Sequence, residues 1–292
     1  MNERHPPIIK QYTFGDLTFR VETPVPMRED TRFEAFSSKS ANPPDHVLLV
    51  RDFRPDQCRE NTWPVITERN GRVITVYMRT ELLSEITVAN LFITARVADL
   101  LPEHGACLLH ASFVLHEGQA ILFSAPSGTG KSTQARYWER ERGSTVVNED
   151  RVMLHKKNGT YMASGAWATG SARLTANITA PIRAIILLGQ GSENRADRCR
   201  PSQALARLMP QCSYDETDGK SVDRMFSILM DLIAHVPIFS YDCINHPSAV
   251  EELEKLIRMK QTESPERSSP CGTDTSTQRP PRGGFLCLAI SS

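Results

Sequence analysis

The sequence has no excess of either charge. Its 34 lysine and arginine residues balance 34 aspartate and glutamate residues, and the two kinds are interleaved along the chain. Proteins that bind the phosphate backbone of DNA or RNA usually present a basic surface. We therefore expect this chain to have no nucleic-acid partner.

Long apolar segments are also lacking. No apolar run reaches the length of about eighteen residues that a membrane-spanning helix needs, and the N-terminal stretch MNERHPPIIKQYTFGD has no apolar core like that of a signal peptide. The seven cysteines are scattered and form no C-x-x-C pair, so neither a disulfide framework nor a zinc site is indicated. We expect a cytoplasmic protein with reduced thiols and no membrane partner.

Glycine is sparse, yet two glycines stand two residues apart in the stretch APSGTGKS. This stretch matches the phosphate-binding loop pattern G-x-x-x-x-G-K-[ST], with Ala125 in place of the first glycine. Gly128 and Gly130 allow backbone N–H groups to turn toward an anion, as such loops require. Lys131 adds a positive charge, and Ser132 offers a hydroxyl to Mg²⁺. The residues predicted to bind the nucleotide are Ala125, Pro126, Ser127, Gly128, Thr129, Gly130, Lys131, Ser132 and Thr133.

The segments on either side of this loop favour the same interpretation. Residues 120–124 (AILFS) form a short apolar run of strand length, and residues 132–142 are rich in residues that favour a helix. A helix that begins at the loop directs its unpaired N–H groups and the positive end of its dipole at the phosphates. A glycine-rich turn that matches the pattern by chance would not require these flanks.

An acidic pair, Glu149 and Asp150, follows this predicted helix closely. Residues 145–148 are expected to form the next strand, so the pair lies where the chain returns to the same edge of the sheet. Phosphoryl transfer needs a metal ligand and usually a carboxylate that orients or deprotonates the nucleophile. The pair offers both groups.

The chain divides into three parts by pattern. Residues 1–80 carry short alternating and β-branched runs, which predict a small β-rich region with hairpins. Residues 81–259 alternate helix-like and strand-like segments and predict an α/β nucleotide-binding domain with a mixed sheet. Residues 260–292 are rich in serine, threonine, proline and glycine, and we expect this tail to be disordered.

Within the second part, the apolar period over residues 81–101 predicts one packing helix. Residues 107–116 and 120–124 flank Glu117-Gly118 and predict a hairpin that ends at the phosphate loop. Further strands are expected at residues 151–155, 182–188 and 236–241, and further helices at residues 202–209, 224–234 and 248–258.

Three segments together resemble the catalytic domain of the HPr serine kinases and, more remotely, the ATP-dependent phosphoenolpyruvate carboxykinases. These segments are LLHAS at residues 108–112, SGTGKST at residues 127–133 and NEDRV at residues 148–152. The chain looks most like the shorter HPr-kinase-related proteins that lack the usual N-terminal domain. The resemblance implies a P-loop kinase fold that uses ATP and Mg²⁺ to phosphorylate a serine of a small protein or peptide.

The resemblance also implies roles for single residues. Lys131 and its loop hold the phosphates, while Ser132 and Asp150 hold the metal ion. Glu149 stands where the family has a catalytic aspartate, and its side chain is longer by one methylene group. His110 matches a family histidine near the active site, although a lone histidine on an apolar strand is as often a core residue. The catalytic candidates are thus Glu149, Asp150, Lys131 and His110.

Other functions stay open at this stage. A small-molecule kinase would use the same loop, because the sequence does not reveal the acceptor pocket. An ATP-binding regulatory module with little turnover is compatible with glutamate at the position of the catalytic aspartate, because a misplaced base lowers the rate greatly. Carboxykinase activity is not expected, since the chain is much shorter than those enzymes. A homo-oligomer is compatible with the sequence, and Trp167 is expected to pack in the core.

Overall fold

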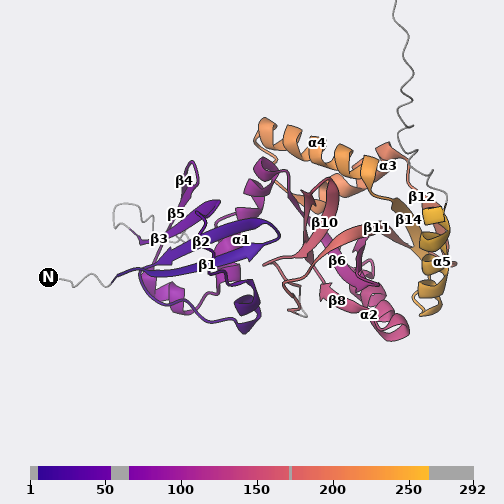
Figure 1. The fold of residues 1–292 in the computed structure, drawn as a ribbon, viewed down its shortest axis with the longest axis horizontal. Helices are drawn as coiled ribbons and strands as arrows, with labels where there is room; N and C mark the ends of the chain where they lie inside the picture. The colour runs from indigo at the N-terminus through magenta and orange to yellow at the C-terminus, as the bar shows by residue number, and fades with distance from the viewer. Residues whose placement is uncertain (1–5, 54–65, 171–172, 263–292) are drawn as a thin grey trace, which may run out of the picture.

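The computed structural model describes residues 6–53, 66–170 and 173–262, which form two β-sheets with helices packed on them (Figure 1). Both sheets contain parallel and antiparallel strand pairs. The predicted α/β class with a mixed sheet is thereby confirmed. The tail that we expect to be disordered, residues 260–292, lies outside the described residues from position 263 onward.

The first sheet has five strands in the order β1-β2-β3-β5-β4. Its strands are Ile8–Phe14 (β1), Leu17–Thr23 (β2), His46–Asp52 (β3), Ile66–Asn70 (β4) and Val73–Met78 (β5). A two-residue turn at Gly15 joins β1 to β2, and a second turn at Gly71 joins β4 to β5. Both glycines have φ 57°, a backbone conformation that residues with a side chain rarely adopt. Thr31–Phe36 forms a short 3₁₀ helix (η1) beside β1.

The segment after the first sheet is not the single helix that its apolar period predicts. Thr87 caps a short helix through a capping box with Asn90, and Arg96 ends it with a φ of 50°. Leu91 and Phe92 still pack under the first sheet, so the apolar period reflects burial and not one continuous helix. The observed pieces are Thr80–Ser84 (η3), Val88–Thr94 (α1) and Val97–His104 (η4).

The second sheet has nine strands, seven of them along the path β10-β9-β6-β7-β11-β14-β12, while β8 and β13 pair with β6. The strands β7, β11 and β14 are parallel neighbours, so their carboxyl ends meet at one edge. The bounds are Cys107–His116 (β6), Gln119–Ser124 (β7), Thr145–Asn148 (β8), Arg151–Lys157 (β9), Thr160–Gly165 (β10), Thr179–Gln190 (β11), Arg195–Arg198 (β12), Cys212–Ser213 (β13) and Ile238–Cys243 (β14).

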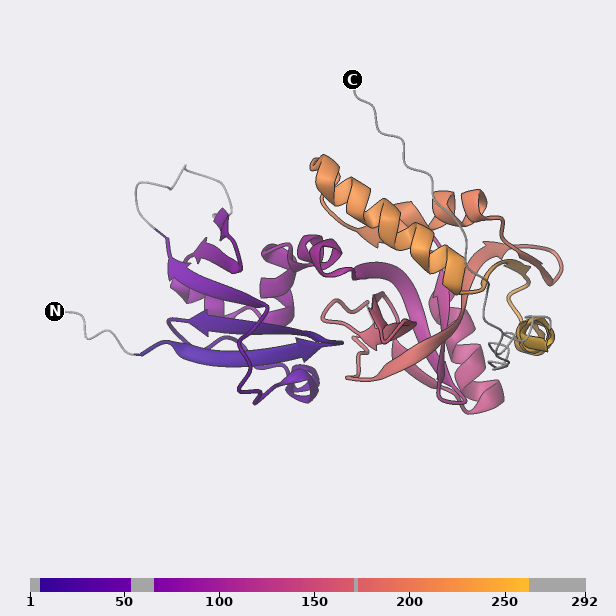
Figure 2. The same ribbon diagram turned by 45° about the horizontal axis from the view of Figure 1, so that its top comes forward.

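Helices cover both faces of the second sheet (Figures 1 and 2). Alternate residues of β7 face opposite ways: Ile121 and Phe123 pack in the cluster that includes α2 and α5, whereas Ala120 and Leu122 pack in the cluster that includes α3 and α4. None of the helices in the described part of the chain is both long and apolar enough to cross a membrane. The helices are Lys131–Arg142 (α2), Pro201–Leu208 (α3), Gly219–His235 (α4) and Ser248–Thr262 (α5), with a 3₁₀ turn at Met209–Gln211 (η5).

Trp167 attaches the second sheet to the core of the first. It follows β10 in the chain, yet its ring packs edge-on against Phe14 at 5.1 Å and Phe92 at 5.4 Å between ring centroids. Its side chain is fully buried. The expectation that Trp167 packs in the core is confirmed, and an aromatic contact of this kind stabilises beyond its buried area.

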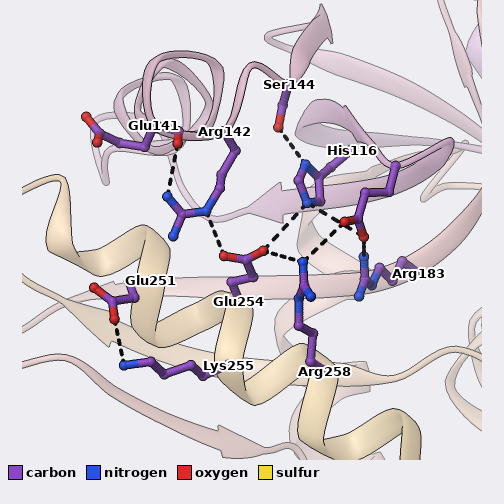
Figure 3. Close-up of polar contacts among 10 residues, drawn as sticks. His116, Glu141, Arg142, Ser144, Arg183, Glu251, Glu254, Lys255 and Arg258 are labelled. Carbon is purple, nitrogen blue, oxygen red and sulfur yellow. Dashed lines mark hydrogen bonds and ion pairs between the residues drawn. The ribbon is translucent and has the colours of Figure 1, made fainter.

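A network of ion pairs fastens α5 to the β6–β7 turn (Figure 3). Glu254 of α5 contacts Arg142 at 2.6 Å and Arg258 at 2.8 Å, and Glu117 contacts Arg258 at 3.2 Å. His116 lies at the centre of this network, where its Nε2 is 3.8 Å from both carboxylates and its Nδ1 is 2.9 Å from the Ser144 hydroxyl. The buried imidazole thus stands between two acidic side chains.

Buried histidines predict that acid destabilises this fold. His46, His116 and His155 are all buried, and burial lowers the pKa of each. The unfolded chain then binds protons more readily than the folded one, so the free energy of unfolding falls as the pH drops through the ordinary histidine pKa of about 6.5. Each additional proton that the unfolded chain binds lowers the free energy of unfolding by up to about 1.4 kcal/mol per pH unit.

Urea unfolding at about pH 7.5 and about pH 5.5 measures this effect. We expect a lower free energy of unfolding at the lower pH, and a smaller drop in His116→Gln, which keeps a polar side chain but does not titrate. Equal free energies of unfolding at the two pH values would contradict the interpretation.

Candidate functional site

The phosphate-loop sequence and the acidic pair lie on neighbouring strands. β7 ends at Ser124, which pairs with Ala111 in the middle of β6. On the other side of β6, the Ala111 N–H donates to the Asp150 carbonyl at 3.0 Å and the Ser112 hydroxyl donates to the Glu149 carbonyl at 3.2 Å. Because β7 and β8 both run antiparallel to β6, the loop and the pair emerge at the same edge of the sheet.

The loop turns tightly between β7 and α2. Gly128 has φ 79° and Gly130 has φ 110°, values that favour glycine. α2 begins at Lys131, and both Ser132 and Thr133 of its first turn line the same cavity as the loop. The first N–H groups of a helix have no partner within the helix, so this end can bind an anion.

The loop and the acidic pair line one cavity of about 360 Å³, here called the acidic cavity. The predicted site residues that line it are His110, Ser127, Gly128, Gly130, Lys131, Ser132, Thr133, Glu149 and Asp150. Of the remaining predicted residues, Ala125 is buried and Pro126 is exposed. Thr129 lines a second cavity of about 390 Å³, the glycine cavity, which the loop forms with the ends of β11 and β14.

Lys131 is held by its own loop. Its ammonium group donates to the carbonyl of Ala125 at 2.9 Å and to that of Pro126 at 3.2 Å, and the side chain is buried. Burial lowers the pKa of Lys131, while the nearby Asp150 opposes this shift. A phosphate in the acidic cavity would offer the ammonium group a charged partner, and such hydrogen bonds are stronger than those to carbonyl groups.

Asp150 faces two basic side chains. Its Oδ1 lies 3.5 Å from His110 Nε2, and its Oδ2 lies 3.8 Å from Arg151 Nε. Hydrogen bonding with His110 is the main cause that lowers the pKa of Asp150; burial opposes it, and Arg151 and Lys131 lower it further. The carboxylate is therefore ionised at neutral pH, and an ionised carboxylate is a ligand that Mg²⁺ prefers.

Glu149 is more deeply buried than Asp150. Its side chain is 6% exposed, against 32% for Asp150. Its Oε1 forms an ion pair of 2.8 Å with Nη2 of Arg136, without the geometry of a hydrogen bond. Arg136 belongs to α2 and follows Ser132 by four residues, one helical turn. The carboxylate thus lines the acidic cavity while a cation compensates its charge.

Asn148 holds the acidic pair in place. It is fully buried, and its Oδ1 accepts hydrogen bonds from the N–H groups of Asp150 at 2.9 Å and Arg151 at 3.1 Å. Its Nδ2 donates to the carbonyls of Ala166 and Ala168, both at 3.4 Å. One side chain therefore joins the turn between β8 and β9 to the chain that follows β10.

Sequence reasoning assigned no role to several residues of this site. Arg136 could have been found from its helical spacing to Ser132, since both lie on one face of α2. Gly170 lines the acidic cavity, and a Cβ added there would lie 3.3 Å from that of Asp150. Gln211, whose Oε1 is 3.1 Å from His110 Nδ1, carries no local signal because 101 positions separate the two residues.

Asn148→Ala should destabilise the fold, because it leaves the N–H groups of Asp150 and Arg151 without the side-chain oxygen that accepts from them. We expect a loss of about 2 to 3 kcal/mol in the free energy of unfolding, measured by urea denaturation. Asn42→Ala is the control, since Asn42 is exposed and its side chain makes no hydrogen bond within the described residues. Equal stability of the two variants would show that Asn148 does not hold the turn.

Comparisons with known proteins give a family. No curated protein matches the sequence. Among the solved structures that match is the Hpr(Ser) kinase/phosphatase from Coxiella burnetii, at 15% identity over 53% of this chain and 98% of its own, with a TM-score of 0.32. A likeness of that extent carries no conclusion about what this chain does. The model of the SynChlorMet cassette protein ScmC family matches residues 79–258, more than half of the chain. The chain therefore belongs to the SynChlorMet cassette protein ScmC family.

Proposed function

We propose that this protein binds ATP with Mg²⁺ and transfers the terminal phosphoryl group to a serine hydroxyl of a small protein or peptide. One observation carries the proposal: a phosphate-loop sequence and an acidic pair line a single cavity of about 360 Å³. Phosphoryl transfer depends mainly on the positioning of the reactants and on the stabilisation of charge, and the loop and the acidic pair can together provide both. The choice of serine as acceptor is supported by the resemblance of the three sequence segments to HPr serine kinases.

The two cavities on either side of the loop suit the two ends of a nucleotide. They share Gly128, Gly130 and Thr133 as lining residues, so a ligand can extend from one cavity to the other across the loop. In the proposed complex the outer phosphates lie in the acidic cavity near Lys131, and the nucleoside lies in the glycine cavity. Gln190 and Asn245 supply polar groups to the glycine cavity.

Ser132 and Asp150 are the residues that would hold Mg²⁺. In kinases this ion usually binds one or two protein oxygen atoms together with phosphate oxygens and water. Ser132 offers a hydroxyl and Asp150 an ionised carboxylate to the acidic cavity, so this donor set fits the requirement. When bound, the ion would neutralise charge that develops on the transferring group. His110 orients the Asp150 carboxylate and is held in turn by Gln211.

Glu149 is the proposed proton acceptor. In the reaction the acceptor oxygen bonds to the terminal phosphorus, the bond from that phosphorus to ADP breaks, and the hydroxyl proton passes to the Glu149 carboxylate. Glu149 lines the acidic cavity together with residues of the loop. Arg136 holds the carboxylate through an ion pair of 2.8 Å.

The same ion pair supports a second candidate function, an ATP-binding regulatory module with little turnover. Glu149 is 6% exposed and faces the guanidinium of Arg136, so it must move or exchange partners before it can meet an acceptor hydroxyl. ATP binding does not need that movement. The two candidates therefore agree on nucleotide binding and differ on transfer.

Nucleotide binding is tested with Lys131→Ala and Asp150→Asn. We expect each variant to weaken the binding of Mg·ATP, measured by calorimetric titration, by at least about tenfold, because each removes a charge that faces the phosphates or the metal ion. Arg140→Ala is the matched control, since Arg140 is a cation of the same helix whose side chain is 62% exposed. Unchanged affinity in Lys131→Ala would refute the phosphate-loop assignment.

Transfer is tested with Glu149→Gln. The amide cannot accept a proton, so we expect normal Mg·ATP affinity and a rate of transfer lower by a factor of about 10² to 10⁴. The assay uses ATP labelled in its terminal phosphate, with a cell lysate and with peptides encoded beside the gene, and separates labelled protein from labelled metabolite. Label that enters only a metabolite would identify a small-molecule kinase. Tight binding by the wild type without transfer to either would favour the regulatory module.

A further inference from the structure

A groove on the first sheet lies outside the site described above. Its volume is about 570 Å³, larger than either cavity beside the phosphate loop. It lies between β1 and the segment of residues 26–39, which includes η1. Apolar side chains that line it are Ile8, Ile9, Val21, Met27, Phe33 and Val88. We call this feature the β1 groove.

β1 is an edge strand, and part of its outer edge is open. The Ser38 N–H donates to the Gln11 carbonyl at 2.8 Å, so the backbone groups of Gln11 point away from β2. In a strand, the N–H and carbonyl groups of every second residue point toward the same edge. The N–H and carbonyl of Ile9 therefore point away from β2, as those of Gln11 do. Within the described residues these two groups of Ile9 have no hydrogen bond. An added extended strand would supply both partners.

The Ile9 side chain strengthens this surface. It is 56% exposed, and it belongs to the few large apolar side chains that the described residues expose to this degree. An extended peptide paired with β1 would cover it while alternate peptide side chains enter the groove. Such a peptide would be stabilised both by the backbone hydrogen bonds to β1 and by the burial of apolar surface.

Charged side chains of both signs line the β1 groove. Lys10 lies on β1, whereas Glu29 stands before η1, Glu34 lies in η1, and Lys39 follows it in the segment of residues 26–39. Within the described residues none of these four side chains forms an ion pair, in contrast to Asp30, which pairs with Arg32. The charges complement a peptide with an acidic side chain toward β1 and a basic one toward η1.

The start of the chain argues against a second copy as the occupant. Pro6 and Pro7 stand directly before β1 and have no N–H group to offer a neighbouring strand. Proline beside an exposed strand is a common device against edge-to-edge pairing of identical chains. The open part of the edge is therefore short, as suits a short peptide segment.

The wall of the β1 groove contacts the chain that reaches the acidic cavity. Arg32 of η1 donates to the Arg173 carbonyl at 2.9 Å, and the Asn177 amide donates to the Ala35 carbonyl at 2.7 Å. Arg173 and Asn177 lie between β10 and β11, in the same connection as Gly170, which lines the acidic cavity. The groove is thus joined through hydrogen bonds to the connection that borders Asp150.

We propose that the β1 groove binds a short extended peptide of mixed charge, which adds to β1 as a further strand, and that this peptide belongs to the phosphate acceptor. The second half of this statement rests on the proposed function. The first half rests only on the edge of β1, the apolar lining and the charges.

Random peptides of about ten residues, displayed on phage and selected against the full chain without nucleotide, test the groove directly. Ile9→Pro removes the outward N–H while proline remains compatible with an edge strand. We expect selected peptides to bind this variant at least about tenfold more weakly than wild type. Ile9→Thr keeps the N–H and should lose less, and Ile93→Thr, which alters a side chain of equal 56% exposure on α1, should lose nothing. Unchanged melting midpoints verify that the variants fold.

Several outcomes would overturn the proposal. If no peptide is enriched on wild type over Ile9→Pro, or if selected peptides bind both equally, the edge of β1 is not the site. If wild type forms a dimer that Ile9→Pro abolishes, the occupant is a second copy. In an added strand, only every second peptide N–H points toward β1. N-methylation of that set of nitrogens should abolish binding, whereas N-methylation of the other set should not, and an equal loss for both sets would exclude strand addition.

The two halves of the proposal fail separately. Peptide selection needs no nucleotide, so a chain that does not bind Mg·ATP would overturn the proposed function and leave the groove result intact. If the chain transfers phosphate but never to a serine placed in or beside a selected peptide, the groove binds some other peptide and the acceptor assignment is wrong.

Discussion

The pairing of β6 with strands on both of its sides is the constraint on which the candidate site depends. β7 delivers the phosphate loop on one side, and the turn between β8 and β9 delivers Glu149 and Asp150 on the other. β6 is buried on both faces, so neither neighbour can shift in register without exposing apolar side chains. Two segments that are separate in the sequence are therefore brought to one edge by strand pairing with β6, and the Asn148 side chain fixes the acidic turn there.

Electrostatic pairing within the site follows from that placement. Each charged side chain that faces the acidic cavity has a partner: Lys131 contacts loop carbonyls, Asp150 contacts His110, and Glu149 contacts Arg136. Buried charges without such partners would be costly, so these contacts allow the site to exist in the folded chain.

Local pattern was enough to predict the elements around the loop, because β7, the glycine turns and α2 each carry their signal in adjacent residues. The hairpins of the first sheet were predicted for the same reason. The prediction of one helix over residues 81–101 was wrong. The Thr87 cap and the left-handed backbone of Arg96 interrupt the helix, while burial maintains the apolar period on both sides of these breaks. Within the site, contacts such as His110 with Gln211 join distant positions, and no local pattern encodes them.

A crystal structure of the full chain with Mg²⁺ and a non-hydrolysable ATP analogue tests the central claim most directly. We expect phosphates at the N-terminus of α2 and a metal ion bound by the Ser132 hydroxyl and the Asp150 carboxylate. We also expect the Lys131 ammonium group to have left the carbonyls of Ala125 and Pro126 for a phosphate. A nucleotide bound elsewhere, with Lys131 still on its own loop, would contradict it.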